Sequence, residues 1–189
     1  MQKGRRIFIV LIIILIMIFI LFGVLKIHIR ILEKMYPKNY SNFVTMYAKE
    51  YQVDENLIYA IIKAESNFNP EAVSGKSAYG LMQIVEETAI DVARRIEPNL
   101  TAEEVMDNIF DVDFNIQLGT KYVSMLLEQY DGNIPLALTA YNAGIGTVNN
   151  WIEKGVLQSD GSDIENIPYK ETNQYVRKIL RDYDIYQNL

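Results

Sequence analysis

An unbroken apolar run near the N-terminus constrains this chain more than any other feature. Residues Ile7–Leu25 are 19 consecutive apolar residues, counting Gly23. As a helix rising about 1.5 Å per residue, the run spans about 28 Å, close to the roughly 30 Å hydrocarbon core of a bilayer. We therefore predict a transmembrane helix over residues 7–25.

A cleaved signal peptide is the alternative interpretation of this run. Such a peptide has an apolar region of about 7–15 residues followed by a cleavage site of small residues. Here the run is longer, and Lys26-Ile27-His28-Ile29-Arg30 follows it. We therefore favour an uncleaved signal anchor. The predicted organisation is a cytoplasmic N-terminus (1–6), an anchor (7–25), a stalk (26–39) and one globular domain (40–189).

The orientation of the anchor depends on the basic residues beside it. Three precede the run and three follow it: Lys3, Arg5 and Arg6, then Lys26, Arg30 and Lys34. The N-terminal amine adds one positive charge and slightly favours a cytoplasmic N-terminus. Nothing after Tyr36 is long and apolar enough to cross again. We therefore expect the whole globular domain on the extracytoplasmic side of the membrane.

The charge of the chain is divided sharply between its two parts. Residues 1–35 contain six Lys and Arg and one acid, whereas residues 36–189 contain 12 Lys and Arg and 23 Asp and Glu, a net charge of −11. Such a domain repels nucleic acids and anionic surfaces, so we predict no nucleic-acid partner. The chain has no Cys, and its only histidine is His28. A histidine-based triad and a histidine-ligated zinc site are thereby excluded from the globular domain.

The globular domain has the periodicity of helices and no convincing strand alternation. Apolar spacing and capping residues predict helices over about 54–66, 84–96, 111–130, 134–142, 147–153 and 171–186. Asp54 and Asn133 are candidate N-caps, and Thr101 with Glu104 forms a candidate capping box. We therefore predict a predominantly α domain.

A glutamate stands where the first of these helices should carry an apolar residue. Ile58, Ile61 and Ile62 precede Glu65 at the spacing i, i+3, i+4, i+7, which is one face of a helix. Burial of a carboxylate raises its pKa, and a general acid at neutral pH needs a shift from about 4.3 to 6 or above. Periodicity alone favours the alternative, an ordinary glutamate at a helix end that is turned to solvent or paired with Lys63 or a distant base.

The loop before the 84–96 helix is a second candidate. It reads Ser77-Ala78-Tyr79-Gly80-Leu81-Met82-Gln83-Ile84. Gly80 permits close approach of backbone to a ligand, and the Gln83 amide can donate to and accept from sugar hydroxyls and amides. Taken alone, the segment also fits a plain junction between a loop and a helix.

Two further segments carry polar groups at helix ends. Tyr141 and Asn142 lie where a helix meets Gly144, an arrangement found in binding clefts and in plain helix C-caps. Glu171 lies in the first turn of the last helix, where the helix dipole favours negative charge. It is either a simple dipole partner, a second carboxylate, or a residue that orders the site.

Together and in this order, these segments resemble the lytic transglycosylases of the soluble-lytic-transglycosylase type. The resemblance covers residues 45–180. Its motifs are Glu65-Ser66, Gly80-Leu81-Met82-Gln83, Ala140-Tyr141-Asn142-Ala143-Gly144, and Pro168 with Glu171-Thr172 and Tyr175-Val176. Two segments depart from the family pattern. Ser77 stands where glycine is commoner, and Val85-Glu86-Glu87-Thr88 replaces a frequent Met-Pro pairing.

The resemblance implies a lysozyme-like, mostly helical domain of the α+β lysozyme superfamily. It implies an enzyme that cleaves the β-1,4 bond between N-acetylmuramic acid and N-acetylglucosamine and leaves 1,6-anhydromuramic ends. Glu65 is then the single catalytic acid and base, with no metal and no cofactor. The residues implied to hold the glycan strand or to orient Glu65 are Ser66, Gly80, Met82, Gln83, Tyr141, Asn142, Glu171 and Tyr175.

Two alternative functions stay open at this point. A lysozyme-like muramidase would deliver water and use a second carboxylate, about 5–5.5 Å away in retaining or 6.5–9.5 Å away in inverting enzymes; Glu171 is its first candidate. A catalytically silent domain could instead bind the wall and anchor an envelope-spanning assembly. The presence of Glu65 argues against the silent domain.

Overall fold

The computed structural model describes residues 2–189, with the side chains from Leu15 onward except that of His28. Met1, the first residue of the predicted cytoplasmic segment, lies outside the described residues. The chain divides into an N-terminal unit that ends at Pro37 and a globular unit of residues Lys38–Asn188.

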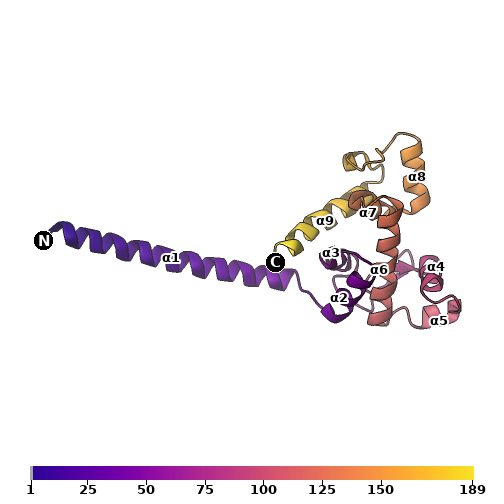
Figure 1. Ribbon diagram of the computed structural model, residues 1–189, viewed down its shortest axis with the longest axis horizontal. Helices are drawn as coiled ribbons and strands as arrows, with labels where there is room; N and C mark the ends of the chain where they lie inside the picture. Colours follow the sequence, from indigo (N-terminus) through magenta and orange to yellow (C-terminus); the bar gives the residue numbers. More distant parts are fainter. Residues whose placement is uncertain (1) are drawn as a thin grey trace. The chain divides into compact units, whose positions relative to one another are not determined.

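The N-terminal unit is one long helix, α1 (Gln2–Met35) (Figure 1). Leu15–Met35, the part of α1 in which side chains are described, is long and apolar enough to cross a membrane, and its large apolar side chains other than Leu32 are exposed. Length and composition of this kind also fit a signal sequence. The helix continues without a break past residue 26, so the segment predicted as a stalk is helical as far as Met35.

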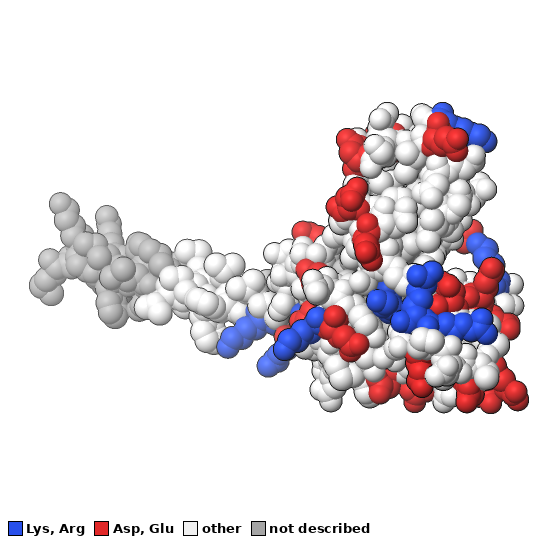
Figure 2. Space-filling view, turned by 45° about the vertical axis from the view of Figure 1, so that its right-hand side comes forward, with Lys and Arg blue, Asp and Glu red and all other residues white. Residues whose placement is uncertain are grey.

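The globular unit is mostly helical, as predicted (Figure 1). Its elements in chain order are α2 (Ser41–Glu50), α3 (Glu55–Ser66), β1 (Ala78–Tyr79), β2 (Ile84–Val85), α4 (Glu86–Ile96), α5 (Ala102–Asp107), α6 (Val112–Gln129), α7 (Ile134–Ala143), α8 (Ile145–Glu153), the short 3₁₀ helix η1 (Ile164–Asn166) and α9 (Lys170–Gln187). Acidic side chains are spread over the face of this unit that Figure 2 shows.

Helix α3 forms the centre of the hydrophobic core. The Asp54 carboxylate accepts a hydrogen bond from the Asn56 amide (2.8 Å), which caps the helix as predicted. Residues 57–62 are all buried, because α3 packs against both α2 and α9. The ring of Tyr59 stacks on that of Tyr186, with the centroids 5.6 Å apart. This packing fixes the position of α3 and therefore the position of the side chains at its C-terminal end.

The small β-hairpin was not predicted. Strands β1 and β2 pair antiparallel, with Ala78 opposite Val85 and Tyr79 opposite Ile84. Two residues per strand are too few to produce a period-2 pattern in the sequence. The predicted helix over 84–96 was therefore wrong at its start, since Ile84 and Val85 belong to β2 and α4 begins at Glu86.

The predicted caps are confirmed elsewhere in the globular unit. Thr101 and Glu104 form a complete capping box at the start of α5. The Asn133 side chain accepts from the Leu136 amide (2.9 Å) and starts α7. Helices α6 and α9 each begin and end within one residue of the predicted bounds. Side-chain caps therefore set the starts of α3, α5, α6 and α7, whereas α2, α4, α8 and α9 begin without one.

Candidate active site

Glu65 lies in the last turn of α3, beside α9. Its Oε1 atom accepts a hydrogen bond from the Tyr175 hydroxyl (2.6 Å). The Lys178 ammonium donates to the Ala64 carbonyl (3.2 Å) and so stands next to this carboxyl group. Burial raises the pKa of Glu65 from 4.5 to about 7, although the Tyr175 hydrogen bond and the Lys178 charge both act to lower it. Glu65 therefore keeps its proton at a higher pH than an exposed glutamate does.

A cavity beside this carboxyl group shares one lining residue with a second cavity. One has a volume of about 560 Å³, and its lining includes Glu65, Ser66, Ser74, Gln83 and Lys178. The other has a volume of about 250 Å³, and its lining includes Gln83, Tyr122, Tyr141 and Asn142. Because both are lined by Gln83, we treat them together as the candidate cleft. The predicted residues Glu65, Ser66, Gln83, Tyr141 and Asn142 all line it.

Gln83 lines both cavities, and its side chain also holds the loop that precedes it in the sequence. Its side-chain nitrogen donates to the carbonyl oxygens of Ala72 (3.0 Å) and Gly80 (2.9 Å). Its backbone has φ of +48°, an uncommon conformation for a residue other than glycine. The amide predicted to bind sugar thus uses its nitrogen to fix the loop.

Gly80 and Met82, which are predicted to contact substrate, are buried in the wall beside the candidate cleft. Met82 has no exposed surface, Gly80 is buried, and neither lines either of the two cavities described above. A side chain at Gly80, whose φ is +75°, would come within 2.3 Å of the Asn115 amide nitrogen. These residues support the wall of the cleft, and their direct contact with sugar stays a prediction.

Asn115 on α6 ties the hairpin to the core. Its side-chain oxygen accepts from the Met82 amide (2.9 Å), and its nitrogen donates to the carbonyl oxygens of Tyr79 (3.1 Å) and Ile109 (2.8 Å). Asn115 is 1 % exposed, so these three bonds satisfy groups that have lost water. The sequence alone did not indicate this function of Asn115.

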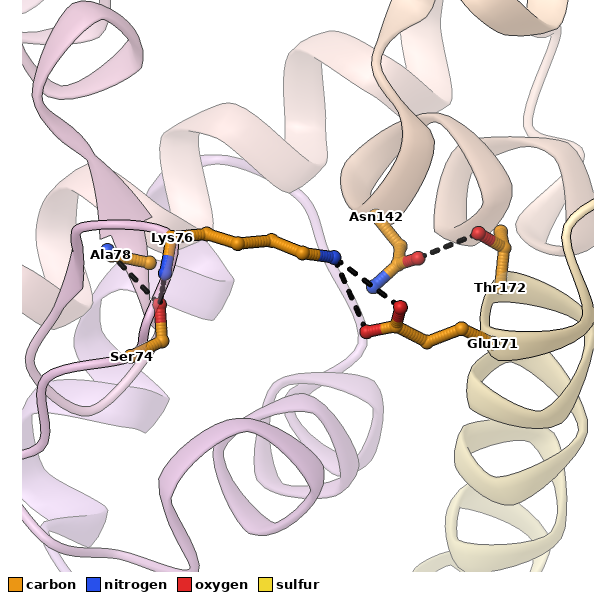
Figure 3. Close-up of polar contacts among 6 residues, drawn as sticks. All are labelled: Ser74, Lys76, Ala78, Asn142, Glu171 and Thr172. Carbon is orange, nitrogen blue, oxygen red and sulfur yellow. Dashed lines mark hydrogen bonds and ion pairs between the residues drawn. The ribbon is translucent and has the colours of Figure 1, made fainter.

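Tyr141 and Asn142 connect the end of α7 to both sides of the cleft. The Tyr141 hydroxyl donates to the Met82 carbonyl (2.6 Å) on the hairpin side. The Asn142 side-chain oxygen accepts from the Thr172 hydroxyl (2.8 Å) on α9, as Figure 3 shows. Ser66, by contrast, donates to the Ile62 carbonyl (3.2 Å) within its own helix.

Glu171 faces a lysine from the opposite side of the cleft. Both of its carboxylate oxygens accept from the Lys76 ammonium, at 3.2 and 3.3 Å (Figure 3). The two side chains are 76 % and 73 % exposed. An exposed pair of this kind contributes only about 0–1 kcal/mol to stability. Glu171 is thus an exposed acid paired to a lysine, which gives no support to its use as a buried second carboxylate.

One stripe of α9 carries a residue that was predicted to belong to the site, Tyr175, and a residue that was not predicted, Lys178. Glu171, Tyr175 and Lys178 stand at the spacing i, i+4, i+7 and follow one stripe of the helix. Tyr175 was predicted from a family motif, whereas Lys178 was not predicted at all. The helical spacing from Glu171 could have indicated Lys178. No spacing in the sequence indicates Lys76, because its contact with Glu171 joins residues that are 95 positions apart.

The departure from the family pattern at Ser77 has a local structural cost. Ser77 has φ of +54°, the left-handed region that disfavours a residue with a Cβ atom by about 1–2 kcal/mol. We expect Ser77→Gly to raise the free energy of unfolding by about 0.5–1 kcal/mol, measured by urea denaturation. Ser77→Ala is the control and should bring no gain. Equal effects of the two substitutions would contradict this explanation.

Comparison with known proteins shows the family of this chain. Residues 42–161 match the family model described as the transglycosylase SLT domain. The match ends before α9, so Glu171 and Tyr175 lie outside it. The chain is 31 % identical over 156 residues to the soluble lytic murein transglycosylase of Salmonella typhimurium, covering 82 % of this chain and 24 % of the relative. It is 38 % identical over 135 residues to the membrane-bound lytic murein transglycosylase C of Yersinia enterocolitica, covering 68 % and 36 %.

Solved structures share the fold. An inactive mutant of lytic transglycosylase Slt from Pseudomonas aeruginosa superposes with a TM-score of 0.72 at 32 % identity, covering 83 % of this chain and 25 % of that one. The 70 kDa soluble lytic transglycosylase of Escherichia coli gives 0.73 at 28 % identity, with the same coverage. The chain spans about a quarter of the length of these relatives. The mostly helical, lysozyme-like fold is thereby confirmed, and the chain belongs to the transglycosylase SLT domain family.

Proposed function

We propose that this chain is a membrane-anchored lytic transglycosylase that cleaves peptidoglycan glycan strands without water. The observation that carries the proposal is the environment of Glu65. One partly buried carboxyl group, whose pKa is raised to about 7, lines an open cleft and is oriented by Tyr175. A group with this pKa can give a proton near neutral pH and later take one back.

In the first step, Glu65 acts as the acid. Its proton passes to the glycosidic oxygen between N-acetylmuramic acid and N-acetylglucosamine, and the bond from C1 to that oxygen breaks. The carbonyl oxygen of the muramyl N-acetyl group supports the positive charge that develops at C1. Glu65 becomes a carboxylate, which the hydrogen bond from Tyr175 stabilises.

In the second step, the same residue acts as the base. The Glu65 carboxylate takes the proton of the muramyl C6 hydroxyl while its oxygen attacks C1. A 1,6-anhydro ring forms, and Glu65 regains the proton with which it began. The atoms balance without a water molecule, and one carboxyl group is sufficient for both steps.

The relatives support the proposed chemistry. Those named above are called lytic murein transglycosylases or lytic transglycosylases. The inactive mutant of the Pseudomonas aeruginosa enzyme carries a glutamate-to-glutamine exchange. That a single carboxyl-to-amide change inactivates a relative is the behaviour we expect of Glu65.

The proposed location is the cell envelope, with α1 as an uncleaved anchor. Leu15–Met35 is long and apolar enough to span a membrane. The Yersinia enterocolitica relative is described as membrane-bound. A wall substrate requires the globular unit outside the cytoplasm, which agrees with a cytoplasmic N-terminus. An anchored enzyme of this kind could open the wall locally for an envelope-spanning assembly.

Muropeptide analysis tests the proposed reaction. Isolated cell walls are digested with the full chain in detergent, and the products are examined by mass spectrometry. We expect fragments with 1,6-anhydromuramic ends. Products heavier by one water, with reducible ends, would instead establish a hydrolase. Intact strands, with wild-type protein bound to the wall, would favour the silent wall-binding domain.

Removal of the Tyr175 hydroxyl should change the pH dependence of cleavage. Burial and the neighbouring Glu65 charge keep the pKa of Tyr175 well above its usual range, so Tyr175 stays a hydrogen-bond donor. Its bond favours the ionised form of Glu65. We expect Tyr175→Phe to shift the alkaline limb of the profile of kcat/KM against pH to higher pH and to lower the rate about tenfold.

Tyr183→Phe is the matched control for that experiment. Tyr183 lies on the same helix and donates to the carboxylate of Asp54 (2.7 Å), away from Glu65. This variant should leave the pH profile unchanged. A profile that does not move in Tyr175→Phe, or that moves equally in both variants, would contradict the assigned function of Tyr175.

A further inference from the structure

The cavity that contains Glu65 is lined by two lysines, although the domain around it is strongly acidic. Lys63 and Lys178 line this cavity together with Glu65, and the other described residues of its lining are uncharged. Residues 36–189 have a net charge of −11, so positive charge is scarce in this part of the chain. When Glu65 holds its proton, the charges that line the cavity are both positive. A cavity of this kind favours an anionic group of a ligand.

The second cavity of the cleft has a different lining. The described residues that line it carry no charge, and they include Gln83, Tyr141 and Asn142. Amide and hydroxyl groups such as these suit the neutral hydroxyl and N-acetyl groups of a glycan. A charged group of the substrate therefore fits the cavity of Glu65 better than the neighbouring cavity.

Lys178 is the better placed of the two lysines. It lies on α9 three residues after Tyr175, and it is exposed. Its ammonium donates to the Ala64 carbonyl (3.2 Å) in the last turn of α3. An ammonium group has three donors, so this bond to α3 uses only part of its capacity. Burial lowers the pKa of Lys63 and the charge of Asp182 partly opposes this effect, so Lys63 already has an acidic neighbour.

The proposed reaction brings a sugar with a carboxyl group to the same cavity. Glu65 acts at C1 and at the C6 hydroxyl of the muramyl unit, so this unit must enter the cavity that Glu65 lines. The muramyl unit bears a lactyl ether, whose carboxyl group is either free or joined as an amide to a peptide stem. The stem has carboxylates of its own, whereas N-acetylglucosamine is neutral. A carboxylate can thus reach the cavity from the lactyl group or from the stem.

We propose that Lys178 binds a carboxylate of the muramyl unit inside the cavity of Glu65. This carboxylate subsite rests on the proposed function, because it names the part of the same substrate that the cavity recognises. Lys178 is then a specificity-determining residue, which selects a muramyl unit with a free carboxylate over a neutral one. An ammonium binds a carboxylate more strongly than a neutral carbonyl such as that of Ala64, so a carboxylate that enters the cavity gains a strong partner.

Strand binding by the full chain in detergent tests the carboxylate subsite. The Glu65→Gln background prevents turnover and keeps position 65 uncharged. Two pairs of glycan strands are compared by their dissociation constants. The first pair has no stems, and its lactyl carboxylates are free or converted to methylamides. The second pair has stems, and the stem carboxylates are free or converted to methylamides.

We expect a preference for the free carboxylates in at least one pair. The strand with free carboxylates should bind about tenfold more tightly than its methylamide, and this preference should decrease as salt rises. A preference in the first pair identifies the lactyl group as the source of the carboxylate, and a preference in the second pair identifies the stem. Equal affinities within both pairs would overturn the subsite and leave the proposed reaction standing. If none of the four strands binds, the subsite fails together with the proposed function.

Three variants in the same background assign the preference to Lys178. Lys178→Gln should reduce it to about twofold or less, whereas Lys178→Arg keeps the positive charge and should keep most of it. Lys170→Gln removes an exposed lysine at the start of α9 that lines neither cavity, and it should keep all of it. If Lys178 only supports the end of α3 through Ala64, the preference will be equal in Lys178→Gln and Lys170→Gln, and the subsite is overturned.

Discussion

Glu65→Gln is expected to abolish strand cleavage, lowering kcat by about 10³-fold or more. Glutamine keeps the size and much of the polarity of glutamate, but its amide can neither give the proton that the leaving oxygen needs nor take the proton of the C6 hydroxyl. Each general acid or base step contributes about 10²–10⁴-fold, and Glu65 serves both. The release of anhydromuropeptides from cell walls over time measures the effect.

A stability measurement shows whether the same variant is correctly folded. The pKa of Glu65 is about 7 in the folded chain and 4.5 without burial, so the folded state binds this proton more tightly. Wild-type stability therefore decreases as pH rises from about 4.5 to about 7, by about 3 kcal/mol. The variant lacks this titration and should be more stable than wild type at pH 8, but not at pH 4. Wild-type cleavage by Glu65→Gln would show that another group is the acid.

Asn115→Ala should cause the largest loss of stability among single polar substitutions in the cleft wall. It leaves the Met82 amide and the carbonyl oxygens of Tyr79 and Ile109 without the partner they share. Each buried polar group left unpaired costs about 1–3 kcal/mol, so we expect a loss of about 3–5 kcal/mol in urea denaturation. Cleavage should weaken too, because the Met82 carbonyl positions Tyr141.

Asn108→Ala is a suitable control for Asn115. The Asn108 side chain also donates to a backbone carbonyl, that of Glu104 (2.8 Å), but at an exposed helix end. Water can replace this partner, so the substitution should cost less than about 1 kcal/mol. Similar losses in the two variants would mean that the Asn115 bonds are not the support of the hairpin.

The sequence predicted those parts of the fold that depend on neighbouring residues. Asp54, Thr101 and Asn133 accept backbone hydrogen bonds within three positions, and the helices begin where these caps predict. The position of Glu65 beside an apolar stripe also follows from helical spacing within seven residues. Such interactions join residues that are close in the sequence, so they can be predicted from a single sequence.

Contacts between distant segments could not be predicted in the same way. Asn115 reaches Met82 across 33 positions, and Lys76 reaches Glu171 across 95. No periodicity links these residues, because their proximity results from tertiary packing, in which α6 contacts β2 and α9 contacts α3. The motif at Gly80 and Met82 indicated that the segment belongs to the site, but not that these two residues are buried in the wall beside the cleft.

The most direct test of this account is a titration of the Glu65 carboxyl group. The full chain is labelled with ¹³C at glutamate side chains, and the signal of Glu65 is assigned by its loss in Glu65→Gln. The account predicts a pKa of about 7, which makes Glu65 a proton donor at neutral pH. A pKa near 4.5 would mean that the carboxyl group is ionised throughout the physiological range, and it would contradict the assignment of Glu65 as the acid.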